Sequence, residues 1–221
     1  DTDVAPFDLG AYASRQTYVA GKAVKRAGEL LKEKVLDYAA FKLKKPAAEL
    51  DMREDWVVRK TSGDKLVALA ELALEAQYSR ERAERLFAEA SIDCHENTIA
   101  TGCTFVELEV DIPLGKVKIL NILNVHDSGI LINPKLAEGQ VQGGMSMGIG
   151  YALFEELLYD DKGRPLNDSL LDYRLPTAMD PPDLHAAFVE VNDPSGPFGN
   201  KALGEPPAIS PAPAIRNAIL Q

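Results

Sequence analysis

The sequence is poor in the residues that build disulfide and metal sites. Among 221 residues there are two cysteines, three histidines and one tryptophan. Eight residues separate Cys94 from Cys103, a spacing that fits neither a disulfide framework nor a common zinc pattern. We therefore expect two buried or reduced thiols, which agree with a cytoplasmic location.

Basic residues and long apolar runs are also scarce. The chain has 24 Lys and Arg against 34 Asp and Glu, a formal net charge of −10. Such an acidic chain is poorly suited to nucleic-acid phosphates or to an anionic membrane surface. No apolar run approaches the roughly 20 residues that span a bilayer. We expect no nucleic-acid partner and no membrane partner.

The remaining composition is that of a globular protein, with 46% hydrophobic and 26% charged residues. The first residues, "DTDVAPFDLG", are acidic and do not resemble a secretory signal. The chain does not begin with Met, and it ends in the apolar helical pattern "AIRNAILQ". We expect it to be a piece of a larger polypeptide.

Helical and strand patterns are mixed along the chain. Apolar residues recur at helical spacing from Thr17 to Phe41, and Asn133 followed by Pro134 is typical of a helix start. The sequence predicts helices over 17–41, 66–77, 133–159 and 207–220, and strands in 56–60, 103–125 and 184–191. Because these elements do not alternate strictly, we expect an α+β fold of mixed sheets with packed helices.

Four glycines interrupt the predicted helix 133–159: Gly143, Gly144, Gly148 and Gly150. Each costs about 1 kcal/mol relative to alanine in a helix interior. Such a cost indicates that something approaches the backbone closely, either another helix or a bound ligand. The residues alone do not decide between these two.

Glu205 is an isolated acid between Gly204 and two prolines, Pro206 and Pro207. Prolines are favoured in the first turn of a helix, so Glu205 is expected at or just before a helix start, where the helix dipole favours a charged carboxylate. Glu205 can be interpreted in two ways, as a helix cap or as a fixed general base. The local pattern alone favours the cap, the commoner role of acids at helix starts.

Other candidate sites are weaker. The loop "GAYASRQT" has small residues ahead of a helix, which suits an anion, but it matches no phosphate-binding motif. His95 and His185 lie in strand-like context and His126 precedes Asp127, yet no glycine-flanked nucleophilic serine accompanies them. The Asp, Cys, His and Glu side chains of "SIDCHEN" are of the kinds that bind metals, but adjacent residues of a strand point to opposite faces, so they cannot all reach one ion. We expect these histidines to be structural and no protein side chain to ligate a metal.

Four segments occur in an order that resembles a known family: "GAYASRQTYVAGKAVKRA", "HDSGILINPKLAEGQVQGGMSMGIGYALFEEL", "LLDYRLPTAMDPP" and "GNKALGEPPAISPAPAIRNAI". The chain resembles the C-terminal half of the molybdenum-binding subunit of the xanthine dehydrogenase / aldehyde oxidoreductase family, most of all its bacterial xanthine dehydrogenase branch. The resemblance implies that 1–221 is the C-terminal part of a molybdopterin-binding domain, with 1–125 and 126–221 as a candidate subdivision.

The resemblance also implies a reaction. These enzymes hydroxylate a carbon beside nitrogen or oxygen with water as the oxygen source, and hydride passes to a molybdenum–sulfido centre. The glutamate of "GEPP", here Glu205, matches the family's general base. Residues matching the cofactor-contacting loop are Tyr12, Ala13, Ser14, Gln16 and Thr17, and Gln140 matches the glutamine that binds the pterin. No side chain of the chain is expected to ligate the metal.

The implied cofactor is molybdenum-molybdopterin, expected in its cytosine dinucleotide form, with [2Fe–2S] clusters and FAD on partner domains or subunits. The implied partners are the N-terminal half of the molybdenum subunit, the iron–sulfur and FAD subunits, and a small heterocyclic or aldehyde substrate. We expect no turnover by the chain alone. Alternatives are another branch (nicotinate dehydrogenase, 4-hydroxybenzoyl-CoA reductase or carbon monoxide dehydrogenase) and a non-catalytic structural or subunit-interaction module.

Overall fold

The computed structural model describes residues 3 and 5–221, and its contacts divide the chain into two compact units. Of the described residues, the first unit contains 3, 5–8 and 21–93, and the second contains 9–20 and 94–221. The subdivision expected at 125/126 falls inside a strand, β5 (Lys116–Asp127). The two units are described separately below.

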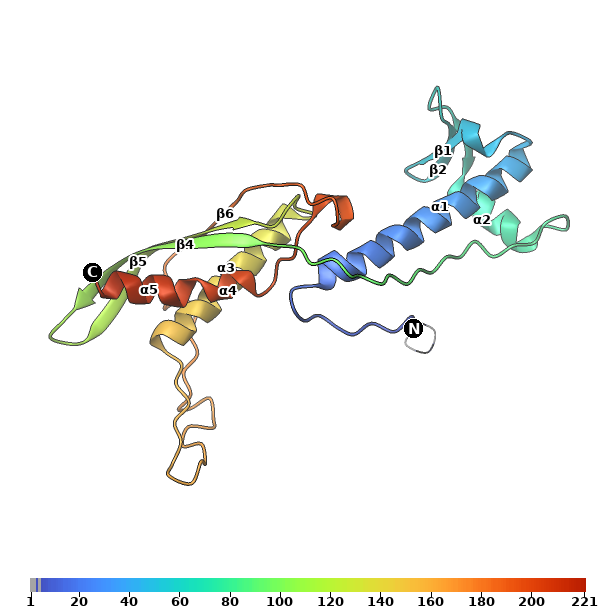
Figure 1. The fold of residues 1–221 in the computed structure, drawn as a ribbon. Helices are drawn as coiled ribbons and strands as arrows, with labels where there is room; N and C mark the ends of the chain where they lie inside the picture. Colours follow the sequence, from blue (N-terminus) through green and yellow to red (C-terminus); the bar gives the residue numbers. More distant parts are fainter. Residues whose placement is uncertain (1–2, 4) are drawn as a thin grey trace. The chain divides into compact units, whose positions relative to one another are not determined.

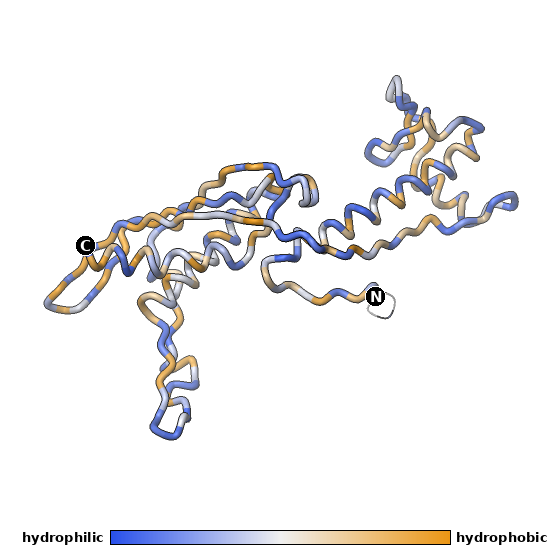
Figure 2. Tube along the Cα trace, viewed as in Figure 1, coloured by the Kyte–Doolittle hydropathy of each residue, from blue (hydrophilic) through white to orange (hydrophobic). Residues whose placement is uncertain are grey.

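The first unit is a small antiparallel sheet covered by two helices (Figure 1). Its sheet has the order β1-β2-β3. Its elements are α1 (Gly21–Leu43), η2 (Ala47–Glu49), β1 (Leu50–Arg53), β2 (Trp56–Arg59), β3 (Lys65–Ala68) and α2 (Leu69–Tyr78). The core forms where the apolar faces of both helices meet the strands, with Tyr38, Val57 and Leu72 completely buried. Figure 2 shows hydrophobic and hydrophilic residues alternating along α1, as expected for a helix with one buried face.

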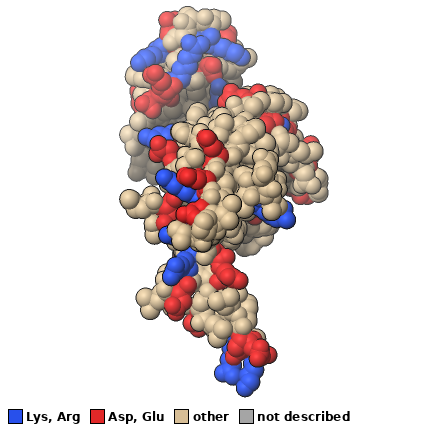
Figure 3. Space-filling model, turned by 90° about the vertical axis from the view of Figure 1, so that its left-hand side faces the viewer, with Lys and Arg blue, Asp and Glu red and all other residues tan. Residues whose placement is uncertain are grey.

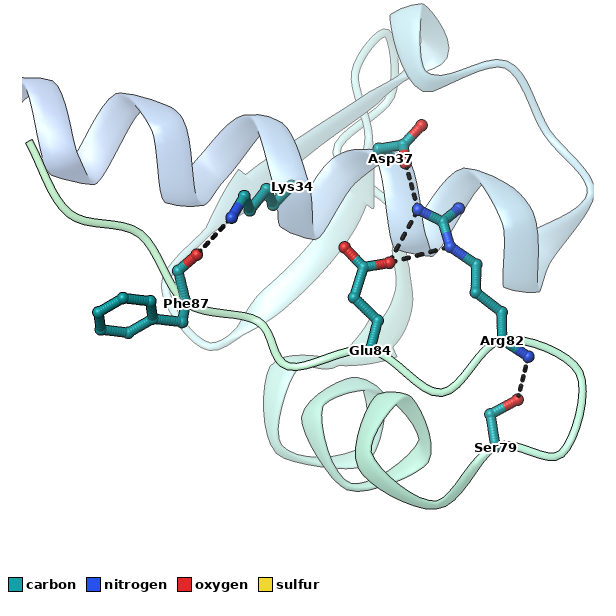
Figure 4. A network of polar contacts seen from close by, with 6 residues as sticks. All are labelled: Lys34, Asp37, Ser79, Arg82, Glu84 and Phe87. Carbon is teal, nitrogen blue, oxygen red and sulfur yellow. Dashed lines mark hydrogen bonds and ion pairs between the residues drawn. The ribbon is translucent and has the colours of Figure 1, made fainter.

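One arginine ties the segment after α2 back onto α1 (Figure 4). The Arg82 guanidinium contacts the carboxylates of Asp37 at 2.6 Å and Glu84 at 2.9 Å. The same cation lies 5.5 Å from the ring centroid of Tyr38. The ammonium of Lys34 adds a hydrogen bond to the Phe87 carbonyl. These contacts hold a segment without regular secondary structure along the helix.

The second unit is a three-stranded mixed sheet of order β4-β5-β6, with helices against one face (Figure 1). Strand β5 pairs antiparallel with β4 and parallel with β6. Its elements are η1 (Gln16–Ala20), β4 (Thr101–Asp111), β5 (Lys116–Asp127), α3 (Pro134–Leu153), β6 (Leu184–Phe188), η3 (Pro197–Gly199), α4 (Pro206–Ile209) and α5 (Pro211–Ile219). The core lies between sheet and helices, where Ile122 meets Val141, Met145 and Ile215.

The α+β class is confirmed, and the boundaries of several elements differ from those expected. The helix expected over 17–41 is a π-helical turn, η1, followed by α1, and these belong to different units. Helix α3 starts as expected, because the Asn133 side chain accepts the Leu136 N–H at 3.1 Å. It ends at Leu153, since the N–H groups of Phe154 and Glu155 both donate to the Gly150 carbonyl. The strand expected around His95 is absent; residues 93–96 have no regular structure.

The motif "LLDYRLPTAMDPP" (170–182) lies in the segment between α3 and β6 (Figure 1). Asn167 closes the start of this segment, because its side chain donates to the Glu156 carbonyl at 2.6 Å and accepts the Leu158 N–H at 2.8 Å.

Acidic and basic side chains are interspersed on the face drawn in Figure 3. No helix of the described residues is both long and apolar enough to cross a bilayer.

Candidate functional site

A cavity of about 650 Å³ opens in the second unit, within the range of about 300–1,000 Å³ typical of small-molecule sites. Three segments form its wall: the loop 11–17, the middle of α3 and the residues around Glu205. These segments are far apart in the sequence; α3 packs against α4, and Ser14 of the loop contacts Glu205. The cavity is the meeting point of the motifs singled out above.

The loop wall has an unusual backbone. Ala13 and Ser14 both have a left-handed conformation, with φ of 50° and 55°, which is rare for residues other than glycine. Tyr18, buried in the turn that follows, lies with its hydroxyl 2.6 Å from the Ser195 hydroxyl and anchors the end of the loop. Such backbone positions persist only where surrounding contacts hold them. Contacts with the surrounding residues therefore hold the loop in this conformation at the cavity.

Ser14 connects this loop to Glu205. Its hydroxyl accepts the backbone N–H of Glu205 at 2.8 Å and donates to Glu205 Oε2 at 3.2 Å. Gly204 permits the approach, because a Cβ at that position would lie 2.9 Å from Ser14 Oγ. One hydroxyl thus fixes both the backbone and one carboxylate oxygen of Glu205, and Oε1 has no hydrogen bond within the described residues.

The capping interpretation of Glu205 does not agree with this geometry. Glu205 occupies the N-cap position of α4, as expected, but its side chain makes no capping hydrogen bond. Helix α4 has four residues, and the carboxylate is directed to Ser14 instead. Glu205 is exposed and lines the cavity. A carboxylate that is fixed at one oxygen and available at the other can accept a proton from a bound molecule.

Helix α3 contributes a polar side chain and an open strip of backbone. Gln140 Nε2 donates to the Gly204 carbonyl at 3.3 Å, which places the glutamine at the edge of the Glu205 segment. Gly139 and Gly143, one turn apart, also line the cavity. An added Cβ on either would meet no atom within 4 Å. The helix therefore presents bare backbone to the cavity, where a flat ligand can approach closely.

Two other α3 glycines, Gly144 and Gly148, serve helix packing. A Cβ on Gly144 would lie 2.6 Å from Pro207 Cβ, and a Cβ on Gly148 would lie 2.8 Å from Pro211 Cβ. These two glycines let α4 and α5 reach the α3 backbone. Helix packing thus explains Gly144 and Gly148, whereas Gly143, like Gly139, lines the cavity. Gly150 has a third surrounding, because a Cβ there would meet Glu155 and Pro176.

The structure brings most of the expected site residues together. Tyr12, Ser14, Gln16, Thr17, Gln140 and Glu205 line the one cavity. Ala13 lies in the same loop but is not part of the lining, and its contribution is the left-handed bend. Arg15 also lines the cavity and was not singled out from the sequence. Its guanidinium donates to the Tyr12 hydroxyl at 2.8 Å, and its position directly after Ser14 was the available signal.

His126 and Asp127 do not form a catalytic pair. They are neighbours on β5, so their side chains point to opposite faces. His126 is 1% exposed, and burial lowers the pKa of its ring, an effect that the nearby Thr101 carbonyl partly offsets. Asp127 Oδ2 pairs with Lys201 Nζ at 2.5 Å and Oδ1 accepts the Gly129 N–H. Within the described residues, no group of three or more His, Cys, Asp or Glu could hold a metal.

The Asp127–Lys201 pair predicts acid sensitivity. Burial alone would raise the pKa of Asp127, but the Lys201 ammonium and the Gly129 N–H hold it below the ordinary value of 3.8. The unfolded chain therefore binds the proton first, and this stabilisation is present above about pH 4 and is lost as the pH falls through the folded pKa. Asp127→Asn should lose about 1–3 kcal/mol of unfolding free energy at neutral pH.

Urea unfolding between about pH 3 and pH 7 measures this dependence. The unfolding free energy of the native chain should fall more steeply below pH 4 than that of Asp127→Asn. Two curves that stay parallel over the whole range would contradict this role of the pair.

Known proteins resemble this chain over nearly its whole length. The family model described as the molybdopterin cofactor-binding domain matches residues 1–182. The chain belongs to this family. The match ends before Glu205, whereas the relatives described next align with nearly the whole chain.

The putative xanthine dehydrogenase molybdenum-binding subunit XdhA of Escherichia coli (strain K12) is 53% identical over 221 residues, covering 99% of this chain and 29% of that protein. The reconstituted CO dehydrogenase from Oligotropha carboxidovorans has a TM-score of 0.87 at 32% identity, covering 99% of this chain and 28% of that one. The quinoline 2-oxidoreductase from Pseudomonas putida 86 has a TM-score of 0.86 at 29% identity, with 98% and 28% coverage. The chain spans less than a third of each. The resemblance read from the sequence is confirmed, as is the fold class.

Proposed function

We propose that the chain forms the Glu205 side of the active site of a molybdenum hydroxylase of the xanthine dehydrogenase type. The observation that supports this most is the cavity that joins Glu205, Gln140 and the loop 11–17. The substrate class that we propose is an N-heterocycle or an aldehyde, and the identity of 53% to the XdhA subunit favours a purine. The proposed function is that of a larger assembly, with iron–sulfur and FAD partners and a cytoplasmic location.

The cavity residues suit a pterin. Gly139 and Gly143 leave room for a flat ring system against the helix, since no atom lies within 4 Å of their Cβ positions. Gln140 and Thr17 offer donors and acceptors, and the Arg15 cation suits a phosphate, as in a cytosine dinucleotide tail. When bound, the molybdenum pterin would supply the two-electron oxidation and activate the water that provides the oxygen.

The chain's own residues hold and move a proton. Ser14 keeps Glu205 Oε2 in place, so that Oε1 remains to accept the proton of the activated water. A base that is already oriented needs little reorganisation in the transition state, which lowers the barrier. The Arg15 guanidinium lies 5.0 Å from the centre of the Tyr12 ring, and both side chains line the cavity. The proposed chemistry therefore requires Glu205 as the base and Ser14 as its support.

A substrate panel in ¹⁸O-labelled water tests this function with the assembled enzyme. Xanthine, hypoxanthine, an aromatic aldehyde, nicotinate and carbon monoxide would each be supplied with a dye acceptor, and product label measured by mass spectrometry. We expect purine turnover with one labelled oxygen in each product. Preferred oxidation of nicotinate or carbon monoxide would favour another branch, and no turnover of any substrate by molybdenum-loaded enzyme would favour a non-catalytic module.

A further inference from the structure

The carbonyl of Pro207 cannot receive its normal helical hydrogen bond. In a helix, the carbonyl of one residue accepts the N–H of the residue four positions later. For Pro207 that residue is Pro211, which has no N–H. Pro207 is buried, so water does not replace the missing donor from bulk solvent. The first turn after Glu205 therefore needs a donor from elsewhere in the fold.

Asn124, in the C-terminal half of β5, supplies that donor. Its side chain is fully buried, and Nδ2 donates to the Pro207 carbonyl at 3.2 Å. The contact comes from the sheet beneath α4, and Asn124 is not part of the cavity lining. It therefore reaches the Glu205 segment from the sheet and not from the cavity lining.

The other polar contacts to this segment come from the cavity wall. Ser14 holds Glu205, and Gln140 holds the Gly204 carbonyl. Both side chains line the cavity, and under the proposed function both have a bound cofactor as a competing partner. The Asn124 contact has no such competitor, because the side chain is buried. It persists whether or not a ligand occupies the cavity.

Asn124 uses only one end of its amide. Its Oδ1 atom is buried and has no hydrogen-bond partner within the described residues. A leucine of similar shape would remove this unpaired acceptor, but it would leave the buried Pro207 carbonyl without a donor, and an unpaired buried acceptor costs more than a typical hydrogen bond contributes. The amide therefore satisfies the Pro207 carbonyl and fixes its direction.

We propose that Asn124 is a positioning residue for Glu205: its amide replaces the N–H that Pro211 cannot provide, and so fixes the first turn of α4 and the direction of the carboxylate. This inference rests on the proposed function of Glu205. Asn124 touches no substrate or cofactor and acts through the backbone of 205–207. A displacement of the base by about 1 Å can cost about 100-fold in rate.

The test compares Asn124→Leu with Thr104→Val in the assembled enzyme. Thr104 makes the matched contact, since its hydroxyl lies 2.6 Å from that of Ser210, farther along the same pair of helices. Both variants remove one side-chain contact between sheet and helices. We expect Asn124→Leu to lower kcat about 10- to 100-fold with an unchanged KM, and Thr104→Val to leave kcat unchanged. Hydrogen exchange of the peptide 203–210, measured without substrate, should quicken in Asn124→Leu.

A rescue variant separates positioning from general damage. Pro211→Ala restores the N–H at 211, so the double variant Asn124→Leu with Pro211→Ala should recover kcat and the slow exchange. An unchanged kcat in Asn124→Leu, an equal loss in Thr104→Val, or no recovery in the double variant would each overturn the proposal. Full activity of a Glu205→Gln enzyme would instead overturn the proposed function itself, so the two failures are distinguishable.

Discussion

Replacing Glu205 with glutamine is expected to lower kcat by about 10²- to 10⁴-fold, the usual contribution of a positioned general base. Glutamine keeps the shape of the side chain, and its amide oxygen can still accept the Ser14 hydroxyl that now reaches Oε2 at 3.2 Å. The amide cannot take up a proton at neutral pH. The change therefore removes the proton acceptor and leaves the cavity wall in place.

The measurement is single-substrate kinetics on the assembled enzyme, together with molybdenum content by elemental analysis. We expect KM and molybdenum content near those of the native enzyme, because the lost interaction forms during proton transfer. Glu138→Gln is the matched control, since Glu138 is an exposed acid of α3, next to the cavity-lining Gly139, that does not itself line the cavity. If kcat of the Glu205→Gln enzyme stays within a few-fold of the control, the result would favour a non-catalytic structural or subunit-interaction module.

Two adjacent glycines of α3 should respond to alanine in opposite ways. At Gly144 the new methyl group would lie 2.6 Å from Pro207 Cβ and 3.1 Å from the backbone nitrogen of Ala208. Backbone atoms cannot rotate away, so α4 must shift, at a cost of about 1–3 kcal/mol. In a chain of this size, each kcal/mol lowers Tm by about 2–4 °C. Because α4 begins directly after Glu205, the same shift should also lower kcat.

At Gly143 the methyl group meets no protein atom within 4 Å. Alanine there should raise helix stability by about 1 kcal/mol, so Tm should stay the same or rise. The methyl group enters the cavity, and molybdenum content should fall.

Thermal unfolding and molybdenum analysis of both variants separate the two roles. Full molybdenum content in Gly143→Ala would show that this strip of backbone does not face the cofactor. An unchanged Tm in Gly144→Ala would contradict the close contact between α3 and α4.

Local sequence signals predicted several elements correctly. The Asn133–Pro134 start of α3 is confirmed by the Asn133 cap, and the strand region expected over 103–125 forms β4 and β5, joined by a turn at Gly115 with φ of 61°. Both signals act within a few residues, so no distant part of the chain can override them easily. The split of the expected helix 17–41 had no such signal, because its two parts follow one continuous apolar pattern and differ in which unit they join.

The sequence by itself determined the family and drew attention to Glu205, because a rigid acid between glycine and prolines is readable from adjacent residues. Only the tertiary structure decided what surrounds that acid: the Ser14 hydroxyl from 191 positions earlier, the bare backbone of Gly139 and Gly143, and the Asn124 amide from the sheet. These contacts join residues far apart in the chain. Which residues meet around Glu205 depends on how α3 and α4 pack on the sheet. The periodicity of a single segment does not predict that packing.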